Sequence, residues 1–178
     1  MRKSRVREIN RIALAAAFIA VCSWLTVPMA VPYTMQSFAV FTVAALLGGK
    51  DSFFAVLVYI ILGAIGVPVF SGMRGGFGVL FGETGGYLLG FLLGSAVCGA
   101  LCRKKKSIAA TFGAMLLCLI MCYTVGCIWA SVLYLGKSES AGLMFILGRF
   151  VLPFVIPDII KIALAVFTVK ALERRRAI

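Results

Sequence analysis

Long apolar runs, separated by short segments that contain charges, glycine or proline, make up most of this chain. Such runs are typical of membrane-spanning helices, because about 20 apolar residues cross the hydrocarbon core of a bilayer. The interruptions predict six transmembrane helices in a single membrane domain, residues 1–178. The expected helices cover approximately residues 8–27, 36–48, 52–66, 84–102, 108–134 and 157–173. A further short helix at the surface is expected within residues 141–154.

The composition agrees with this pattern. Hydrophobic residues make up 62% of the 178 residues, and the mean hydropathy is +1.08. Soluble domains are only about half apolar, so we expect an all-α integral membrane protein. Six spans with short loops leave no room for a soluble domain beside them.

Lysine and arginine residues gather in four places: the first 11 residues, Lys50, residues 103–106 and the end of the chain from Lys170. The remaining basic residues are Arg74, Lys137, Arg149 and Lys161. Cytoplasmic loops carry an excess of basic residues, so six spans predict that both the N- and the C-terminus are cytoplasmic. The basic clusters then lie beside anionic lipid, which indicates the bilayer and not a nucleic acid as their partner.

The first helix has two features with open alternatives. Its basic start and apolar run also resemble a secretory signal, although a protein with several spans needs no cleavage there. Small residues repeat every four positions and form a flat face for close helix packing. This face either packs within the chain or docks on another membrane subunit. The alanines concerned are Ala13, Ala16, Ala17 and Ala20.

A second stripe of small residues runs along the fourth expected helix, from Gly82 through Gly86, Gly90 and Gly94 to Cys102. Its four-residue spacing predicts a close-packing face. The chain has no histidine and six cysteines, all within apolar runs. We interpret the cysteines as small buried hydrophobes and expect no metal site. The cysteines are Cys22, Cys98, Cys102, Cys118, Cys122 and Cys127.

Asp158 and Lys161 are the charges within the apolar stretch 155–169. Pro157 is expected to open the last helix at its first turn, and the three-residue spacing places both charges on one helix face. Charges inside a membrane segment are costly and usually mark a functional site. The alternative is an aspartate near the positive end of the helix dipole and a lysine that reaches the interface.

Three segments converge on the outer side in this topology: the loop 32–36, the glycine-rich loop 67–83 leading into the fourth helix, and the start of the last helix. Together they are expected to line a pocket for a small, partly apolar ligand that carries a carboxylate and hydrogen-bonding groups. Backbone N–H groups at a helix start suit an oxygen atom of such a ligand. The candidate ligand contacts are Thr34, Gln36, Arg74, Gly86, Tyr87, Asp158 and Lys161.

Four motifs in order and spacing resemble the BioY family, the biotin-specific substrate-binding (S) components of energy-coupling factor (ECF) transporters in bacteria. The motifs are VPYTMQSFAVF, LGAIGVPVFSG, TGGYLLGF and VLPFVIPDIIK. The resemblance covers essentially the whole chain. It implies a six-helix S-component fold in the bacterial cell membrane, with biotin as the ligand and no cofactor. It also implies a transmembrane coupling subunit, docked on the first helix, and two cytoplasmic ATPases.

The resemblance assigns Asp158, Lys161 and residues 84–87 to the biotin site and implies that the loop 32–36 gates it. Glu83 stands where members of the family often have proline, and an ion pair with Arg74 would weaken the role of Arg74 as a ligand contact. The alternative function is an ion-coupled secondary transporter of a small carboxylate-bearing solute, with Asp158 as its relay. An enzyme is not expected, because no nucleophile with a partner base is evident.

Overall fold

The computed structural model describes residues 2–28, 32–104, 107–135 and 142–176, and most of these residues are helical. Two short strands pair as an antiparallel hairpin between the first two helices. The elements in chain order are α1 Arg2–Trp24, β1 Thr26–Val27, β2 Tyr33–Thr34, α2 Gln36–Leu47, α3 Gly49–Ala64, α4 Phe77–Leu80, α5 Gly85–Lys104, α6 Ile108–Tyr134, α7 Leu143–Phe150 and α8 Leu152–Arg176.

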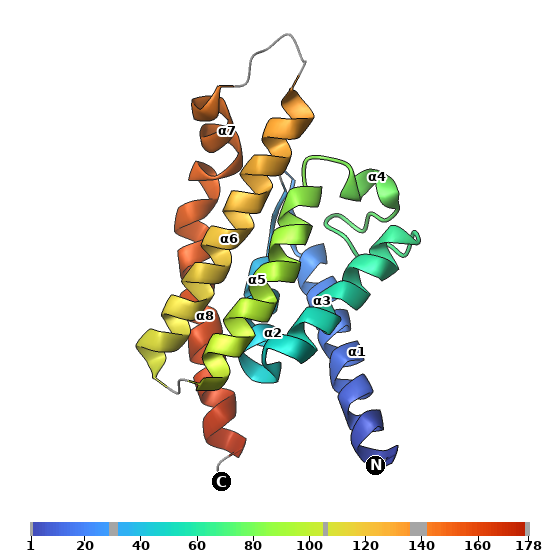
Figure 1. Cartoon of the computed structure of the whole chain (residues 1–178), viewed down its shortest axis with the longest axis vertical. Helices are drawn as coiled ribbons and strands as arrows, with labels where there is room; N and C mark the ends of the chain where they lie inside the picture. Colours follow the sequence, from blue (N-terminus) through green and yellow to red (C-terminus); the bar gives the residue numbers. More distant parts are fainter. Residues whose placement is uncertain (1, 29–31, 105–106, 136–141, 177–178) are drawn as a thin grey trace.

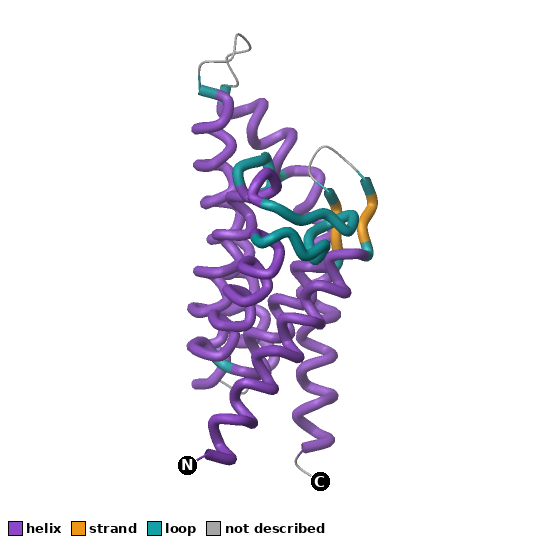
Figure 2. The backbone as a smooth tube through the Cα atoms, turned by 90° about the vertical axis from the view of Figure 1, so that its right-hand side faces the viewer, coloured by secondary structure: helices purple, strands orange, loops and turns teal. Residues whose placement is uncertain are grey.

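The helices form a bundle with α5 at its centre (Figure 1). Helix α5 packs against α6, α3 and α2, whereas α8 packs against α2 and α6. Helix α1 packs on α3 and α2. The hairpin and the loop that contains α4 lie in the half of the bundle away from the termini (Figure 2). The bundle therefore has a loop-rich end and an end of helix termini.

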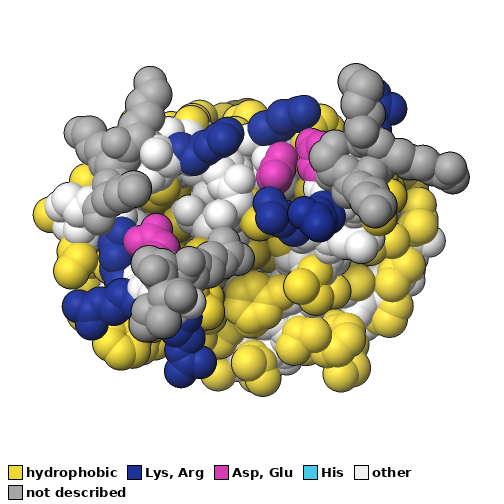
Figure 3. Space-filling view, turned by 90° about the horizontal axis from the view of Figure 1, so that it is seen from below, with side chains coloured by type: hydrophobic (Ala, Val, Ile, Leu, Met, Phe, Trp, Pro, Cys, Tyr) yellow, Lys and Arg dark blue, Asp and Glu magenta, His cyan; other side chains and the backbone are white. Residues whose placement is uncertain are grey.

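Both chain termini, the end of α5 and the start of α6 lie at one end of the molecule (Figure 1). Lysine and arginine side chains gather over this face (Figure 3). The charge pattern predicts that these basic segments share one side of the membrane, and the fold brings them to one end of the molecule. Which side of the membrane this end faces stays a prediction.

Among the residues that the structure describes, three helical segments are long and apolar enough to cross a membrane: Gly85–Arg103, Ile108–Tyr134 and Leu152–Arg175. Helix α2 has 12 residues and α3 has 16, which is about 18 and 24 Å of helix at 1.5 Å per residue. Helix α1 is longer, but its first half is basic. The all-α membrane class is confirmed, whereas six complete spans stay a prediction.

Two helix starts differ from the sequence expectation by five residues or more. Helix α8 begins at Leu152, so Pro157 lies inside the helix and does not open it. A proline inside a helix removes one backbone hydrogen bond, but its fixed φ is close to the helical value. Helix α1 begins at Arg2 and includes the basic segment, because lysine and arginine are good helix formers. It ends at Trp24, before the Thr26–Val27 strand begins.

The small-residue face of α1 divides into two parts. Ala16 and Ala20 are buried within the chain, whereas Ala13 and Ala17 are exposed. Ala16 and Ala20 thus face their own bundle, and the docking role of this face stays a prediction. Ala13 and Ala17 lie on the outer face of α1.

The glycine stripe of α5 packs on α6, as the spacing predicted. Gly86 lies against Trp129 and Gly126, and a Cβ atom at Gly90 would lie 2.6 Å from the Cα atom of Cys122. The absence of side chains at these positions lets the two backbones approach closely.

We expect Gly90→Ala to lower the apparent melting temperature of the detergent-solubilised protein, because the added methyl group meets α6 backbone. Overpacking of this kind costs about 1–3 kcal/mol. Gly113→Ala is the matched control, since a Cβ at Gly113 meets nothing within 4 Å. Unchanged melting of the Gly90 variant would contradict the close packing.

Candidate functional site

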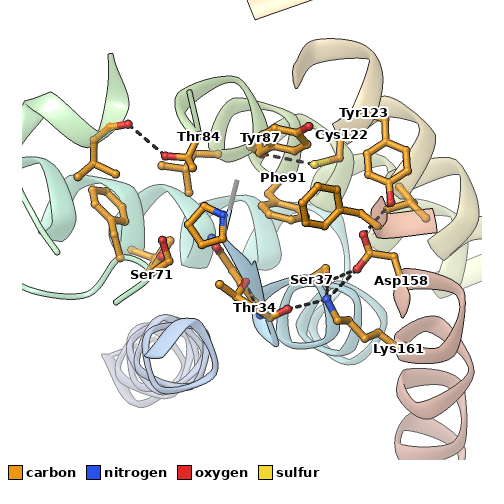
Figure 4. A pocket seen from close by; sticks show the side chains of 18 residues that line it. Thr34, Ser37, Ser71, Thr84, Tyr87, Phe91, Cys122, Tyr123, Asp158 and Lys161 are labelled. Atoms are coloured by element: carbon orange, nitrogen blue, oxygen red, sulfur yellow. Dashed lines mark hydrogen bonds and ion pairs between the residues drawn. The ribbon is translucent and has the colours of Figure 1, made fainter. Parts of the chain in front are cut away.

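A cavity lies among α2, α5, α6 and α8 and is completed by residues of the hairpin and of the loop between α3 and α5 (Figure 4). Its lining combines a polar cluster with an apolar wall. Five of the residues predicted from the sequence line it: Thr34, Gln36, Tyr87, Asp158 and Lys161. The apolar wall includes Phe70, Leu88, Phe91, Leu119 and Phe154.

Asp158 and Lys161 form a buried ion pair on one face of α8. The Lys161 Nζ atom lies 2.8 Å from Oδ1 of Asp158, and the two residues are only 3% and 6% exposed. A helix places residues three apart on the same side, so the sequence spacing predicted this pair. The alternative interpretation, in which Lys161 reaches the membrane interface, is wrong because the ammonium group is buried.

Both members of the ion pair also form hydrogen bonds with residues of other elements. Oδ1 of Asp158 accepts a hydrogen bond from the Ser37 hydroxyl at 2.9 Å, and Oδ2 accepts one from the Tyr123 hydroxyl at 2.8 Å. Lys161 donates to the Thr34 carbonyl oxygen at 2.6 Å and to Ser37 Oγ at 3.1 Å. The ion pair therefore connects β2, α2, α6 and α8 (Figure 4).

An aromatic ring covers the ammonium group. The Nζ atom of Lys161 lies 3.9 Å from the centroid of the Tyr33 ring, which is a favourable cation–π arrangement. Burial and the negative charge of Asp158 raise the pKa of the Tyr33 phenol, so this ring stays neutral at physiological pH.

Ser37 and Tyr123 were missed in the sequence analysis. Ser37 follows Gln36 directly, and nothing in the local sequence distinguishes this serine as a site residue. Tyr123 carried a usable signal, because a tyrosine in the middle of an apolar span needs a partner for its hydroxyl. Both side chains fix the orientation of the Asp158 carboxylate.

Tyr87 and Gln36 differ in what they offer to a ligand. The Tyr87 hydroxyl donates to the carbonyl oxygen of Phe150, so its proton is already used and its ring contributes to the cavity wall. Gln36 is buried and lines the cavity. Within the described residues its side-chain amide makes no hydrogen bond, so both of its polar atoms remain available.

Arg74 and Gly86 do not line the cavity. Arg74 is exposed and donates to the carbonyl and hydroxyl oxygens of Ser71, at 3.1 and 3.4 Å. The suggested ion pair with Glu83 does not form among the described residues, since Glu83 instead accepts a hydrogen bond from Tyr134 at 2.5 Å. Gly86 faces α6 and serves close packing.

Metal chemistry has no evident site in the part of the chain that the structure describes. There, no group of three or more cysteine and acidic side chains is arranged to hold an ion. Four of the six cysteines are buried and two are half-buried. Cys122 contributes its side chain to the cavity wall, in line with a role as a small hydrophobe.

Comparison with known proteins identifies the sequence family. The model of the BioY family matches residues 1–177. The chain is 35% identical over 170 residues to the probable biotin transporter BioY of Pyrococcus horikoshii, covering 95% of this chain and 98% of that protein. It is 36% identical over 158 residues to the biotin transporter BioY of Thermotoga maritima, covering 88% and 80% of the two chains.

A solved structure supports the same relationship. The crystal structure of the S-component for biotin from an ECF-type ABC transporter matches with a TM-score of 0.86 at 26% identity, covering 98% of this chain and 94% of that chain. The expected S-component fold is thereby confirmed, and these relatives are named as transport proteins and not as enzymes. By sequence over nearly its whole length and by fold, the chain belongs to the BioY family.

Proposed function

We propose that this protein is the biotin-binding subunit of an ECF-type uptake transporter and that it captures biotin in the cavity beside Asp158 and Lys161. The observation that supports this most directly is the buried ion pair in a cavity that also has an apolar wall, within a fold shared with a biotin S-component. A buried charge pair in a membrane protein is costly to keep and usually serves a ligand or an ion.

The chemistry of the cavity suits biotin. Biotin has a cyclic urea with two N–H donors and one carbonyl acceptor, an apolar thioether ring and a carboxylate tail. The Asp158 carboxylate can accept from a urea N–H group, and the aromatic wall around Phe91 suits the thioether ring. The Gln36 amide, which makes no hydrogen bond within the described residues, offers a donor and an acceptor to the remaining polar groups.

The topology supports capture from outside the cell. If the basic end that holds both termini is cytoplasmic, the loop-rich half with the cavity faces outwards in a bacterial cell membrane. The hairpin that contains Thr34 then covers the outer side of the site. Energy would come from a transmembrane coupling subunit and two cytoplasmic ATPases, with Ala13 and Ala17 on the docking face.

Calorimetric titration of the purified protein in detergent tests the proposal. We expect one-to-one binding of biotin and no binding of lipoate or thiamine, which differ in their ring chemistry. Folding is checked by a monodisperse elution profile and a cooperative thermal transition. Folded protein without affinity for biotin would refute the proposed function.

The buried Asp158 also supports a second candidate, an ion-coupled secondary transporter of a small carboxylate-bearing solute. The two functions differ in their energy source. Uptake that survives a protonophore but fails on ATP depletion excludes ion coupling, whereas the reverse result favours it.

The Tyr123 hydroxyl is expected to support ligand affinity through Asp158. Tyr123→Phe removes one donor from the carboxylate, and hydrogen bonds to charged groups are worth about 1.5–3 kcal/mol, so biotin affinity should fall by roughly tenfold or more. Tyr134→Phe makes the same chemical change on α6 outside the cavity lining and should leave the affinity within about twofold. Equal affinities of the two variants in the same titration would contradict a role for Tyr123.

A further inference from the structure

The loop between α3 and α5, residues 65–84, exposes large apolar side chains although it contains no transmembrane helix. Ile65, Met73, Phe77 and Phe81 are each between 62% and 69% exposed. We infer that this segment, called here the α4 loop, lies in the interface of the lipid bilayer and inserts these side chains among the acyl chains. These lipid contacts are expected whether or not the ligand of the cavity is biotin.

The position of α4 along the bundle places the loop beside the bilayer and not above it. Helix α6 is long and apolar enough to cross a membrane, and α4 lies at the side of the bundle, between the levels of the two ends of α6 (Figure 1). Helix α3 has 16 residues, or about 24 Å of helix, whereas the hydrocarbon core is about 30 Å thick. The α4 loop therefore covers the depth that α3 leaves uncrossed.

The backbone of the α4 loop is supplied with hydrogen-bond donors from the protein. Four side chains, including both tryptophans of the chain, donate to carbonyl oxygens of the loop. The pairs are Ser23 to Val69 at 2.5 Å, Trp24 to Pro68 at 2.8 Å, Thr84 to Val79 at 3.3 Å and Trp129 to Gly82 at 3.0 Å. Carbonyl groups in contact with water need no such donors, whereas backbone groups near hydrocarbon must be satisfied within the protein.

The charges of the α4 loop suit the headgroup region. Arg74 and Glu83 are its two charged residues. The Glu83 carboxylate accepts a hydrogen bond from Tyr134, whereas Arg74 is exposed and uses two N–H groups on Ser71. A guanidinium group has five N–H donors, and a long basic side chain can reach from apolar surroundings to a lipid phosphate. The loop thus offers a cation to the phosphates and aromatic rings to the acyl chains.

The opposite side of the same loop lines the cavity. Phe70 is 1% exposed, packs edge-on against the Tyr59 ring and lines the cavity together with Ser71. Phe77 and Phe81 do not line it. The α4 loop is therefore a wall with ligand on one side and lipid on the other, so lipid contact supports a segment that shapes the cavity.

Photo-crosslinking from the exposed phenylalanines tests the lipid contact. Separate full-length variants carry p-benzoylphenylalanine in place of Phe81 or Phe77 and are reconstituted in nanodiscs of phosphatidylcholine and phosphatidylglycerol. Ile120, which is 53% exposed within α6, is replaced as the lipid-facing control, and exposed Arg5 near the start of α1 as the aqueous control. After irradiation, mass spectrometry should detect phospholipid adducts at the two loop positions with a yield at least about tenfold above that at Arg5.

Adduct yields no higher than at Arg5 would overturn the inference, because the loop would then lie in water. Crosslinks between two copies of the chain in place of lipid adducts would also overturn it. If the bulky probe disturbs folding, Phe77→Cys replaces it in the same nanodiscs. Its reaction with a membrane-impermeant maleimide should be at least about tenfold slower than that of Arg5→Cys, because a thiol in apolar surroundings stays protonated. The unchanged protein corrects for the six native cysteines, and equal rates would overturn the inference.

Discussion

Asp158→Asn is expected to weaken biotin binding by about 2–5 kcal/mol, which corresponds to a factor of roughly 30 to several thousand in Kd. The substitution removes the negative acceptor that the cavity offers to a urea N–H group. It also leaves the Lys161 ammonium group, which is only 3% exposed, without its charge partner. Both consequences act on the same site, so this is among the largest effects expected of any single substitution.

Calorimetric titration measures this effect directly, and Asp51→Asn provides the matched control. Asp51 lies in the first turn of α3, outside the cavity lining, so its removal should change the Kd by less than about twofold. Thermal unfolding of both variants separates loss of binding from loss of structure. Affinity of the Asp158 variant within about twofold of the unchanged protein would exclude this carboxylate from the site.

The ion pair shows what the sequence can predict. Asp158 and Lys161 are conspicuous because charges are rare in apolar segments, and their three-residue spacing fixes a shared face once a helix is assumed. The α5 stripe was predictable for the same reason, since Gly90 and its neighbours repeat with the period of the helix. Local periodicity thus predicted the helices, the packing face and the charge pair.

The partners of the ion pair depend on contacts between distant segments. Ser37 and Tyr123 reach Asp158 from positions 121 and 35 residues away, and no local pattern specifies such distances. Arg74 is the complementary case. Its charge was visible in the sequence, but the fold leaves it exposed beside Ser71, where it does not line the cavity.

The start of α8 was predicted wrongly because the prediction relied on the position of a single proline. Pro157 suits the first turn of a helix, yet the helix begins five residues earlier at Leu152. Packing of α8 against α2, α6 and α7 favours a continuous helix over the preference of one residue. The spacing of apolar positions along the chain does not reveal such packing between helices, so it could not predict where α8 begins.

Ala17→Leu is expected to abolish biotin uptake while leaving biotin binding unchanged. Ala17 is exposed on α1, so a larger side chain there meets nothing in the bundle and should not disturb the cavity. On a docking face, the same side chain prevents the close helix approach that small residues permit. Ala13→Leu, one helical turn away on the same face, should have the same effect.

The measurement pairs titration of the purified variant with biotin uptake by cells that also contain the coupling subunit and the two ATPases. We expect a Kd within about twofold of the unchanged protein and at least a tenfold fall in uptake. Ala163→Leu is the control, because Ala163 is exposed on α8, away from α1. Normal uptake by the Ala17 variant would show that α1 is not the docking face. Loss of biotin binding by that variant would show instead that residue 17 packs within its own chain. Ala17 does not line the cavity, so the substitution can weaken binding only by disturbing the packing of the bundle.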